Sequence, residues 1–176
     1  MKLLKALEKK EKKILVLSHS EKIYQDCMET ASFITKNDKI CLYITLNKPA
    51  TAIKKEIKKR KLNPKKFYFI DGISQSVTEP KEEKNILYVP NPSHLMSIAN
   101  AIQELTSIVG DEGVVLIDAL RTLSIYNNPT EVSDFLSFLI KKTKDSGPSL
   151  ITFTTRADKN SIKEYSSFFD SVIQAD

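Results

Sequence analysis

Short apolar runs alternate with longer helix-like segments along almost the whole sequence. The runs are rich in β-branched, leucine and aromatic residues and are bounded by polar or turn-forming residues, which is typical of β-strands. They predict strands at residues 14–17, 40–46, 67–70, 86–89, 114–117, 150–154 and 172–174. Residues 114–117 are apolar at every position, which indicates a strand that is buried on both faces of a sheet.

Between these runs, apolar residues recur every three or four positions and predict amphipathic helices. The predicted helices cover residues 21–36, 51–61, 94–109 and 130–144, and a last one begins near Ser161. The expected N-caps, whose short side chains can accept a hydrogen bond from the helix, are Ser20, Ser93 and either Thr130 or Ser133. Gly110 is expected to end the third helix. Residues 73–85 are polar and are expected to form an exposed loop.

Strands separated by helices in this rhythm imply an α/β fold with a mostly parallel central sheet and helices on both faces, which is a three-layer sandwich. The 176 residues, 41% of them hydrophobic, suit one compact domain, expected at residues 14–176. Residues 1–13 carry three leucines among charges and are expected to form a short helical extension. No apolar run approaches the ~20 residues that span a bilayer, and the N-terminal segment lacks the cleavage site of a signal peptide.

Two cysteines, Cys27 and Cys41, fall in a predicted helix and a predicted strand. Two cysteines in a chain of this length do not make a disulfide framework, so the sequence favours a reducing cytoplasm. They also lack the companion ligands that a tetrahedral metal site requires. Both are expected to be buried as small apolar side chains.

Positive charge is concentrated in the first part of the chain. Residues 1–66 contain 18 Lys and Arg against 7 Asp and Glu, whereas residues 67–176 contain 9 against 15, and the whole chain carries +5. One interpretation is a nucleic-acid surface, with candidate residues Lys54, Lys55, Lys58, Lys59 and Arg60. The other is a solvated helix face, which is favoured because no aromatic residue is interleaved with these charges to stack on bases.

The place of a candidate site follows from the predicted sheet, because open parallel sheets bind ligands beyond the carboxyl ends of their strands. Polar residues follow several of the predicted strands at that edge. The candidate ligand-binding residues are Ser18, His19, Ser20, Lys22, Asn47, Asp71, Asp118, Thr154 and Arg156. Asp118 stands directly after the buried strand and needs a hydrogen-bond partner there, for which Ser18 and Thr154 are the candidates.

Three parts of the chain resemble the RecA/KaiC-like ATPase domains, and the likeness extends over residues 14–175. Residues 40–46 (ICLYITL) are similar to the second strand of the KaiC group, and residues 114–120 (VVLIDAL) are similar to the Walker B strand. Residues 152–156 and 169–173 are similar to the sensor strand and to the closing element. The resemblance implies the P-loop NTPase fold, in which Asp118 takes the position of the carboxylate that bonds the metal-bound water.

The sequence departs from the family's pattern at two places that ATP hydrolysis requires. A phosphate loop needs glycines, which let backbone N–H groups approach the phosphates, followed by a lysine and a hydroxyl residue. Residues 18–24 (SHSEKIY) contain no glycine, and no Ser or Thr follows Lys22 to hold magnesium. Where the family places a catalytic glutamate, the chain has Asn47. We therefore expect no catalytic residue, no ATPase activity and no metal site, with Asp118 as the one residue that could hold an ion.

Three functions fit these observations. The first is a non-catalytic regulatory module that binds a protein partner or further copies of itself, as the resemblance to small archaeal KaiC-like proteins with a degenerate nucleotide loop implies. The second is a regulator that binds a nucleotide or another anion, with ATP and magnesium as alternative cofactors, because the helix near Ser20 offers free backbone N–H groups. The third is nucleic-acid binding through the basic helix at residues 51–61.

Overall fold

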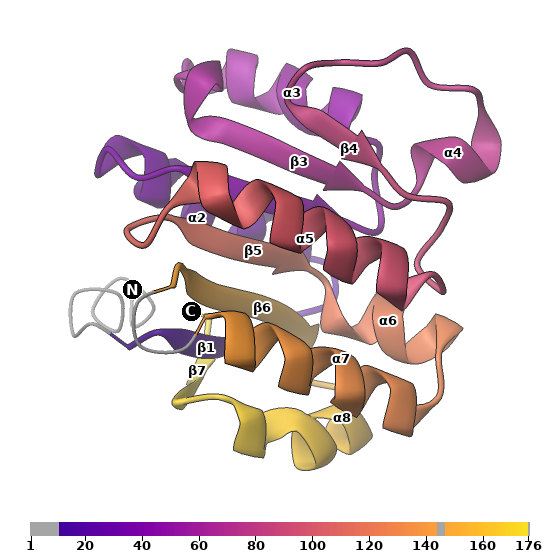
Figure 1. Cartoon of the computed structure of the whole chain (residues 1–176). Coiled ribbons are helices and arrows are strands. Elements are labelled where there is room, and N and C mark those ends of the chain that lie inside the picture. Colours follow the sequence, from indigo (N-terminus) through magenta and orange to yellow (C-terminus); the bar gives the residue numbers. More distant parts are fainter. Residues whose placement is uncertain (1–10, 144–146, 176) are drawn as a thin grey trace.

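The computed structural model describes residues 11–143 and 147–175 and has a seven-stranded sheet at its centre. Every strand pairing in the sheet is parallel, and the strand order is β4-β3-β2-β5-β6-β1-β7 (Figure 1). The strands are β1 (Lys13–Ser18), β2 (Cys41–Thr45), β3 (Phe67–Asp71), β4 (Ile86–Tyr88), β5 (Val114–Asp118), β6 (Ser149–Thr155) and β7 (Ser171–Gln174). All seven strands predicted from the sequence are confirmed.

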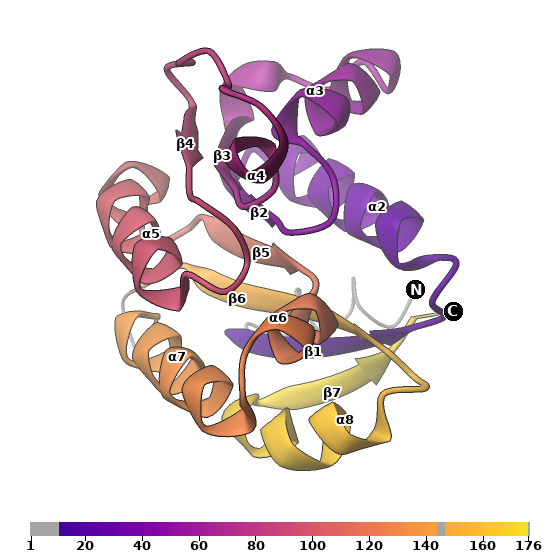
Figure 2. The ribbon, with the colours of Figure 1, turned by 90° about the vertical axis from the view of Figure 1, so that its right-hand side faces the viewer.

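Helices cover both faces of the sheet, so the predicted three-layer architecture is confirmed. Helices α2 and α3 lie on one face, and α5, α7 and α8 lie on the other, whereas α4 and α6 lie at the carboxyl ends of the strands, which face the viewer in Figure 2. The helices are α2 (Ile23–Lys36), α3 (Ala50–Lys59), α4 (Ser74–Val77), α5 (Leu95–Val109), α6 (Leu120–Tyr126), α7 (Pro129–Lys142) and α8 (Lys159–Tyr165). Two short 3-10 segments, η1 (Pro64–Lys66) and η2 (Ser166–Phe168), precede β3 and β7.

Each strand contributes side chains alternately to two hydrophobic cores. Ile14 and Val16 of β1 enter the core beneath α2 and α3, whereas Leu15 and Leu17 enter the core beneath α5, α6 and α7. The central strand β5 is buried at every position, as the sequence predicted. Helices therefore cover both faces of the sheet, so a polar site can form only at the ends of the strands.

The structure contains two short helices that the hydrophobic pattern does not predict. Helix α4 forms within residues 73–85, where an exposed loop was expected, and Asp71 holds its start by accepting hydrogen bonds from the backbone N–H groups of Ile73 and Ser74. Helix α6 begins two residues after β5 and leaves Ile125 and Tyr126 exposed. Its apolar residues therefore do not follow the one-sided pattern by which helices are recognised.

The expected caps of α2 and α5 are wrong. The N-cap residue of α2 is Lys22, whose side chain makes no capping hydrogen bond, and the hydroxyl of Ser20 is hydrogen-bonded to the hydroxyl of Thr155 instead. The hydroxyl of Ser93 likewise donates to the side chain of Asn91 rather than accepting from α5. At the other end of α5, Gly110 takes the C-cap position with a φ of 69°, as expected.

Helices α7 and α8 each begin slightly earlier in the sequence than expected. Asn128 caps α7 and forms a reciprocal capping box with Glu131, instead of the two hydroxyl residues predicted further on. The proline that follows Asn128 suits the first helical position because it lacks an N–H group. In α8 the side chain of Asp158 accepts from the backbone N–H of Ser161, so Ser161 lies inside the helix.

Residues 1–10 lie outside the described part of the chain, and with them most of the helical extension that was expected at residues 1–13. Lys13, the last residue of the expected extension, is instead the first residue of β1. Among the residues that the structure describes, no helix combines the length and the apolar character needed to cross a membrane.

Both cysteines are free and fully buried, as predicted, Cys27 in α2 and Cys41 in β2. Burial raises the pKa of both thiols, so neither forms the reactive thiolate near neutral pH. We expect neither thiol to react with Ellman's reagent at about pH 8 until the chain unfolds. The check is the chromophore released in native buffer and in guanidinium, and one rapid equivalent in native buffer would contradict the expectation.

Candidate functional site

Polar side chains end five neighbouring strands on the face covered by α2 and α3. In the order of the sheet they are Asp71, Thr45, Asp118, Thr155 and Ser18, and we call this set the polar row. All five are buried, with at most 2% of their surface exposed. Because these residues end their strands, the polar row lies at the carboxyl edge of the sheet, the edge that faces the viewer in Figure 2. Open parallel sheets bind their ligands at this edge. It is therefore the candidate functional site.

Asp118 is held at the centre of the polar row by two side chains. The hydroxyl of Tyr43 donates to Asp118 Oδ2 at 3.0 Å, and Asn47 Nδ2 donates to Asp118 Oδ1 at 3.2 Å. The hydroxyl of Thr122 donates in turn to Asn47 Oδ1 at 2.7 Å. The partners expected for Asp118, Ser18 and Thr154, are therefore wrong. The four side chains Tyr43, Asp118, Asn47 and Thr122 form one hydrogen-bonded chain across β2, β5 and α6.

The surroundings of Asp118 act on its charge in opposite directions. Burial raises the pKa of this carboxyl, and the hydrogen bonds from Tyr43 and Asn47 and the positive charge of Lys48 oppose the rise. Lys48 itself lies with its Nζ 3.4 Å from the centre of the Tyr24 ring, as a cation–π pair. The net effect on Asp118 is a raised pKa, because the loss of water outweighs its partners.

The loop between β1 and α2 is a tight turn that is fastened to the end of β6. The backbone N–H groups of Lys22 and Ile23 both donate to the carbonyl of His19 at 2.9 and 3.1 Å. The hydroxyls of Ser20 and Thr155 lie 2.7 Å apart, and Arg156 Nη1 lies 3.1 Å from His19 Nε2.

Arg156 also binds the backbone of two strands. Its Nε donates to the carbonyl of Leu17 in β1 at 3.4 Å, and its Nη2 donates to the carbonyl of Ala175, just after β7. The guanidinium therefore joins the ends of β1, β6 and β7, and this contact accounts for its position without a ligand.

Asp71 stabilises the starts of two helices. Its Oδ2 accepts from the backbone N–H of Ala50 at 2.7 Å, and its Oδ1 accepts from Ile73 N and Ser74 N, each at 2.9 Å. The hydroxyl of Ser74 also donates to Oδ2 at 2.7 Å. Four donors thus surround one fully buried carboxylate, which ties β3 to α3 and α4.

The two hydroxyl residues that complete the polar row are also bonded within the chain. Ser18 donates to the carboxylate of Asp26 in α2, and Thr45 donates to the carbonyl of Lys48. Thr154, by contrast, alternates with Thr155 and faces the opposite core, where its buried hydroxyl has no hydrogen-bond partner among the described residues.

The structure brings together only part of the residues proposed from the sequence. Asn47 and Asp118 are in contact, and His19 and Ser20 are held against the end of β6. Asp71 is two strands away from Asp118 in the sheet, and Lys22 is exposed on the turn before α2.

Tyr43 was not among the residues proposed from the sequence, although it bonds Asp118 directly. It lies two residues before the end of β2, and strand alternation therefore puts it on the same face as Thr45. That signal was present in the sequence, but it identifies a partner of Asp118 only when β2 and β5 are known to be neighbours.

The described surroundings of Asp118 do not suit direct coordination of a magnesium ion. Both carboxylate oxygens of Asp118 already accept hydrogen bonds, and only 2% of the residue is exposed. Within residues 11–143 and 147–175, no group of three or more His, Cys, Asp or Glu side chains could hold a metal ion. All five side chains of the polar row are hydrogen-bonded within the chain.

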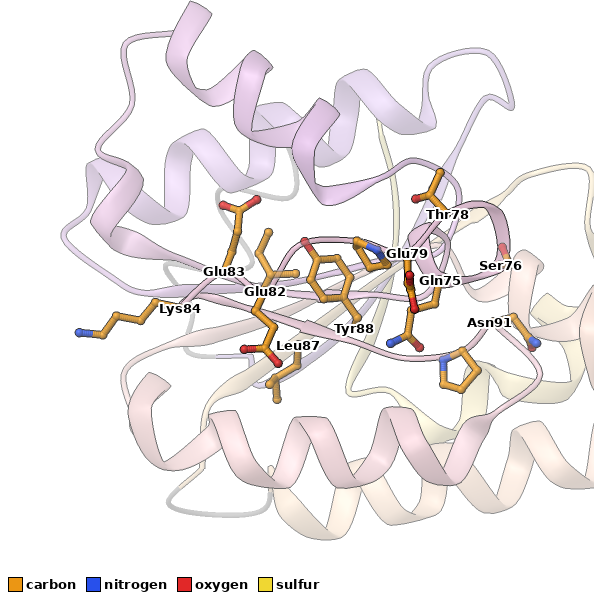
Figure 3. Close-up of a pocket in the computed structure, with 13 residues that line it drawn as sticks. Gln75, Ser76, Thr78, Glu79, Glu82, Glu83, Lys84, Leu87, Tyr88 and Asn91 are labelled. Atoms are coloured by element: carbon orange, nitrogen blue, oxygen red, sulfur yellow. The ribbon is translucent and has the colours of Figure 1, made fainter.

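A separate groove of about 1030 Å³ runs along the outer strand β4. Figure 3 shows its lining, in which Leu87 points toward α5 and Tyr88 points to the opposite side of the strand. Glu79, Glu82 and Glu83 give this groove an acidic character. Burial and the charge of Glu83 raise the pKa of Tyr88, so its hydroxyl stays neutral.

Comparison with solved structures identifies the fold. No protein-family model and no curated protein matches the sequence. A KaiC-like protein of the hyperthermophilic archaeon Pyrococcus horikoshii is similar in structure, with a TM-score of 0.63 and 14% identity over 93% of this chain and 72% of that one. An uncharacterized protein of the same organism, in complex with an unknown peptide, is similar with a TM-score of 0.67 and 13% identity over 94% and 78%. The chain therefore has the RecA-like fold of the KaiC-like proteins, as the sequence predicted.

Proposed function

We propose that this chain is a RecA-like domain that does not hydrolyse ATP and acts as a regulatory module by binding another protein. The observation that most directly supports the proposal is the burial and internal hydrogen bonding of the polar row. All five of its side chains are buried, and all five are hydrogen-bonded to other parts of the same chain. A site that acts on a ligand needs polar groups that remain available to it.

Phosphoryl transfer needs a phosphate cradle, a metal ion and a group that orients the attacking water. The turn between β1 and α2 contains no glycine and is bonded to β6, which leaves no backbone cradle of the P-loop kind. Asn47 stands where the resemblance implies a glutamate, and its amide donates to Asp118 instead of accepting a proton from water. The turn and Asn47 together argue against turnover of ATP.

Exposed apolar side chains near the carboxyl edge support protein binding. Val77 of α4, Met96 of α5, and Ile125 and Tyr126 of α6 are each exposed by 55% or more. Large exposed apolar residues that gather on one side of a molecule are typical of surfaces that bind proteins. The Pyrococcus horikoshii protein with a bound peptide adds that a domain of this fold can hold a polypeptide ligand.

An anion-binding regulator is the second candidate, and one observation favours it. The side chain of the N-cap residue Lys22 makes no capping hydrogen bond at the start of α2, where the N–H groups of a helix attract negative charge. Arg156 and His19 lie beside the turn that precedes this helix. Arg156 is engaged with the backbone of Leu17 and Ala175, which reduces its availability. We therefore rank this candidate below protein binding.

The test is isothermal titration calorimetry of the full chain with ATP, ADP and GTP plus magnesium, combined with a phosphate-release assay. We expect no saturable heat up to about 1 mM nucleotide and no phosphate release above the buffer rate. Micromolar binding with turnover would overturn the proposal. Binding without turnover that is lost in Arg156→Ala would favour the anion-binding regulator.

A further inference from the structure

A second groove lies beside α3 and encloses about 610 Å³, within the range of roughly 300–1,000 Å³ that ligand pockets occupy. It shares Glu83 with the groove in Figure 3 but is formed by other elements, namely α3, the turn after it, and the start of β3. Its apolar lining residues are Ile57, Leu62, Pro64, Phe67 and Phe69. Ile57, Phe67 and Phe69 are at most 2% exposed and Leu62 is 8% exposed, so the open apolar surface comes mainly from the exposed Pro64 and from lysine stems.

Lysines form the rim of this groove. Lys54, Lys55, Lys58 and Lys61 line it, and their spacing places them along one side of α3 and the turn that follows. Among the lining residues that the structure describes, Glu83 is the one acidic residue, and it is paired with Lys54. Among the residues that the structure describes, the other three lysines form no salt bridge. The groove thus combines an apolar floor with uncompensated positive charge.

We infer that this groove, which we call the lysine groove, binds an acidic peptide segment that carries one or two bulky apolar side chains. The carboxylates of such a segment complement the positive charge of the lysine rim. Its apolar side chains bury the apolar floor of the groove away from water. The inference rests on the proposed function and adds to it a second surface, apart from the exposed apolar residues near the carboxyl edge, with the chemistry of the segment that it binds.

The same lysines were the basis for nucleic-acid binding, which the geometry favours less. Phe67 and Phe69, the aromatic residues in the described lining of the groove, are fully buried, whereas single-stranded nucleic acids bind largely by stacking their bases on exposed rings. Arg60 is paired with Glu56, and Lys59 does not line the groove, so the basic residues do not form one continuous phosphate-binding surface.

The experiment measures fluorescence anisotropy of a fluorescein-labelled decapeptide in which glutamates flank a central Phe-Leu pair, titrated with the full chain. We expect saturable binding that weakens at least about tenfold in the variant K55E/K58E/K61E, which corresponds to about 1.4 kcal/mol. The same peptide with Ser-Ser in place of Phe-Leu should bind at least about fivefold more weakly, because the floor of the groove loses its ligand.

The matched control is K141E/K159E/K163E, which makes the same change of net charge with exposed lysines of α7 and α8. Its affinity for the peptide should stay within about twofold of the affinity of the parent chain, since exposed charges distant from the groove are screened by salt. Equal weakening in both variants would overturn the inference, as would the absence of saturable binding. Tighter binding of a single-stranded oligonucleotide, lost in K55E/K58E/K61E, would assign the groove to nucleic acid.

Failure of this experiment is distinguishable from failure of the proposed function. If the peptide does not bind and nucleotides show neither binding nor turnover, the lysine groove is not the partner surface, and the non-catalytic role is unaffected. Nucleotide turnover would contradict the proposed function whatever the peptide does.

Discussion

Replacing Asp71 by alanine is expected to lower the free energy of unfolding by about 4 kcal/mol. The substitution removes the acceptor of four hydrogen bonds, from the backbone N–H groups of Ala50, Ile73 and Ser74 and from the hydroxyl of Ser74. Each buried donor that loses its partner costs about 1–3 kcal/mol, and partial relaxation or entry of water recovers some of the sum. Urea unfolding followed by circular dichroism measures the loss.

Asp111→Ala is the matched control, because Asp111 is exposed and its carboxylate accepts no hydrogen bond within the described residues. It should change stability by no more than about 0.5 kcal/mol. Asp71→Asn should fall between the two, since the amide keeps one acceptor oxygen but turns a donor toward the other groups. A loss below about 1 kcal/mol for Asp71→Ala would show that Asp71 does not hold α3 and α4 in place.

Replacing Asp118 by asparagine is expected to stabilise the chain at neutral pH. Burial raises the pKa of Asp118, which means that the ionised form is disfavoured in the folded protein. Asparagine has nearly the same shape, can accept from Asn47 Nδ2 through its oxygen, and can donate to the hydroxyl of Tyr43. It therefore keeps both contacts and avoids burying a charge.

The gain from Asp118→Asn should depend on pH in a defined direction. The folded pKa lies above the value of about 3.9 that Asp has in unfolded chains, so the folded state holds the proton more tightly between these two values. Wild-type stability is therefore lost as pH rises through the folded pKa, and the variant does not share this loss. The difference should be near zero below about pH 4 and should grow, by about 1.4 kcal/mol for each unit of raised pKa, until it levels off.

Urea midpoints of both proteins between about pH 3.5 and pH 8 provide the measurement. Asp134→Asn, at an exposed position of α7, is the control and should give a difference that does not follow this curve. If Asp118→Asn destabilised the chain at pH 7 and not at pH 4, the ionised carboxylate would be needed for folding. A bound cation at the polar row would then have to be considered again.

The strands and the layer architecture could be predicted because their signal is local. Residues 114–117 are a continuous apolar run, and such a run predicts a strand that is buried on both faces of a sheet. Helix α6 was missed because it is only seven residues long and exposes Ile125 and Tyr126, so that no apolar stripe distinguishes it. Short elements at the sheet edge are set by contacts with neighbouring segments, which the sequence does not display.

The candidate site was located by the sequence, but the role of each side chain was not. Asp71 and Asp118 both end apolar strands and look equivalent in sequence, yet one supports two helix starts and the other bonds Tyr43 and Asn47. Tyr43 and Asp118 are 75 residues apart and meet only because β2 and β5 are neighbours in the sheet. Which strands are neighbours is a property of the whole fold, so the local pattern could not reveal the partner.

The strand order also determines when the sheet can be completed during synthesis. β1 lies between β6 and β7, and Lys13 pairs with Leu150 across most of the chain. Neither neighbour of β1 exists until the ribosome has made the residues from Ser149 onward. An early-made strand with no partner exposes apolar residues, a situation that slows folding and favours aggregation. A nascent chain stopped before β6 should therefore remain sensitive to protease at β1, even with β2, β3 and β5 already present.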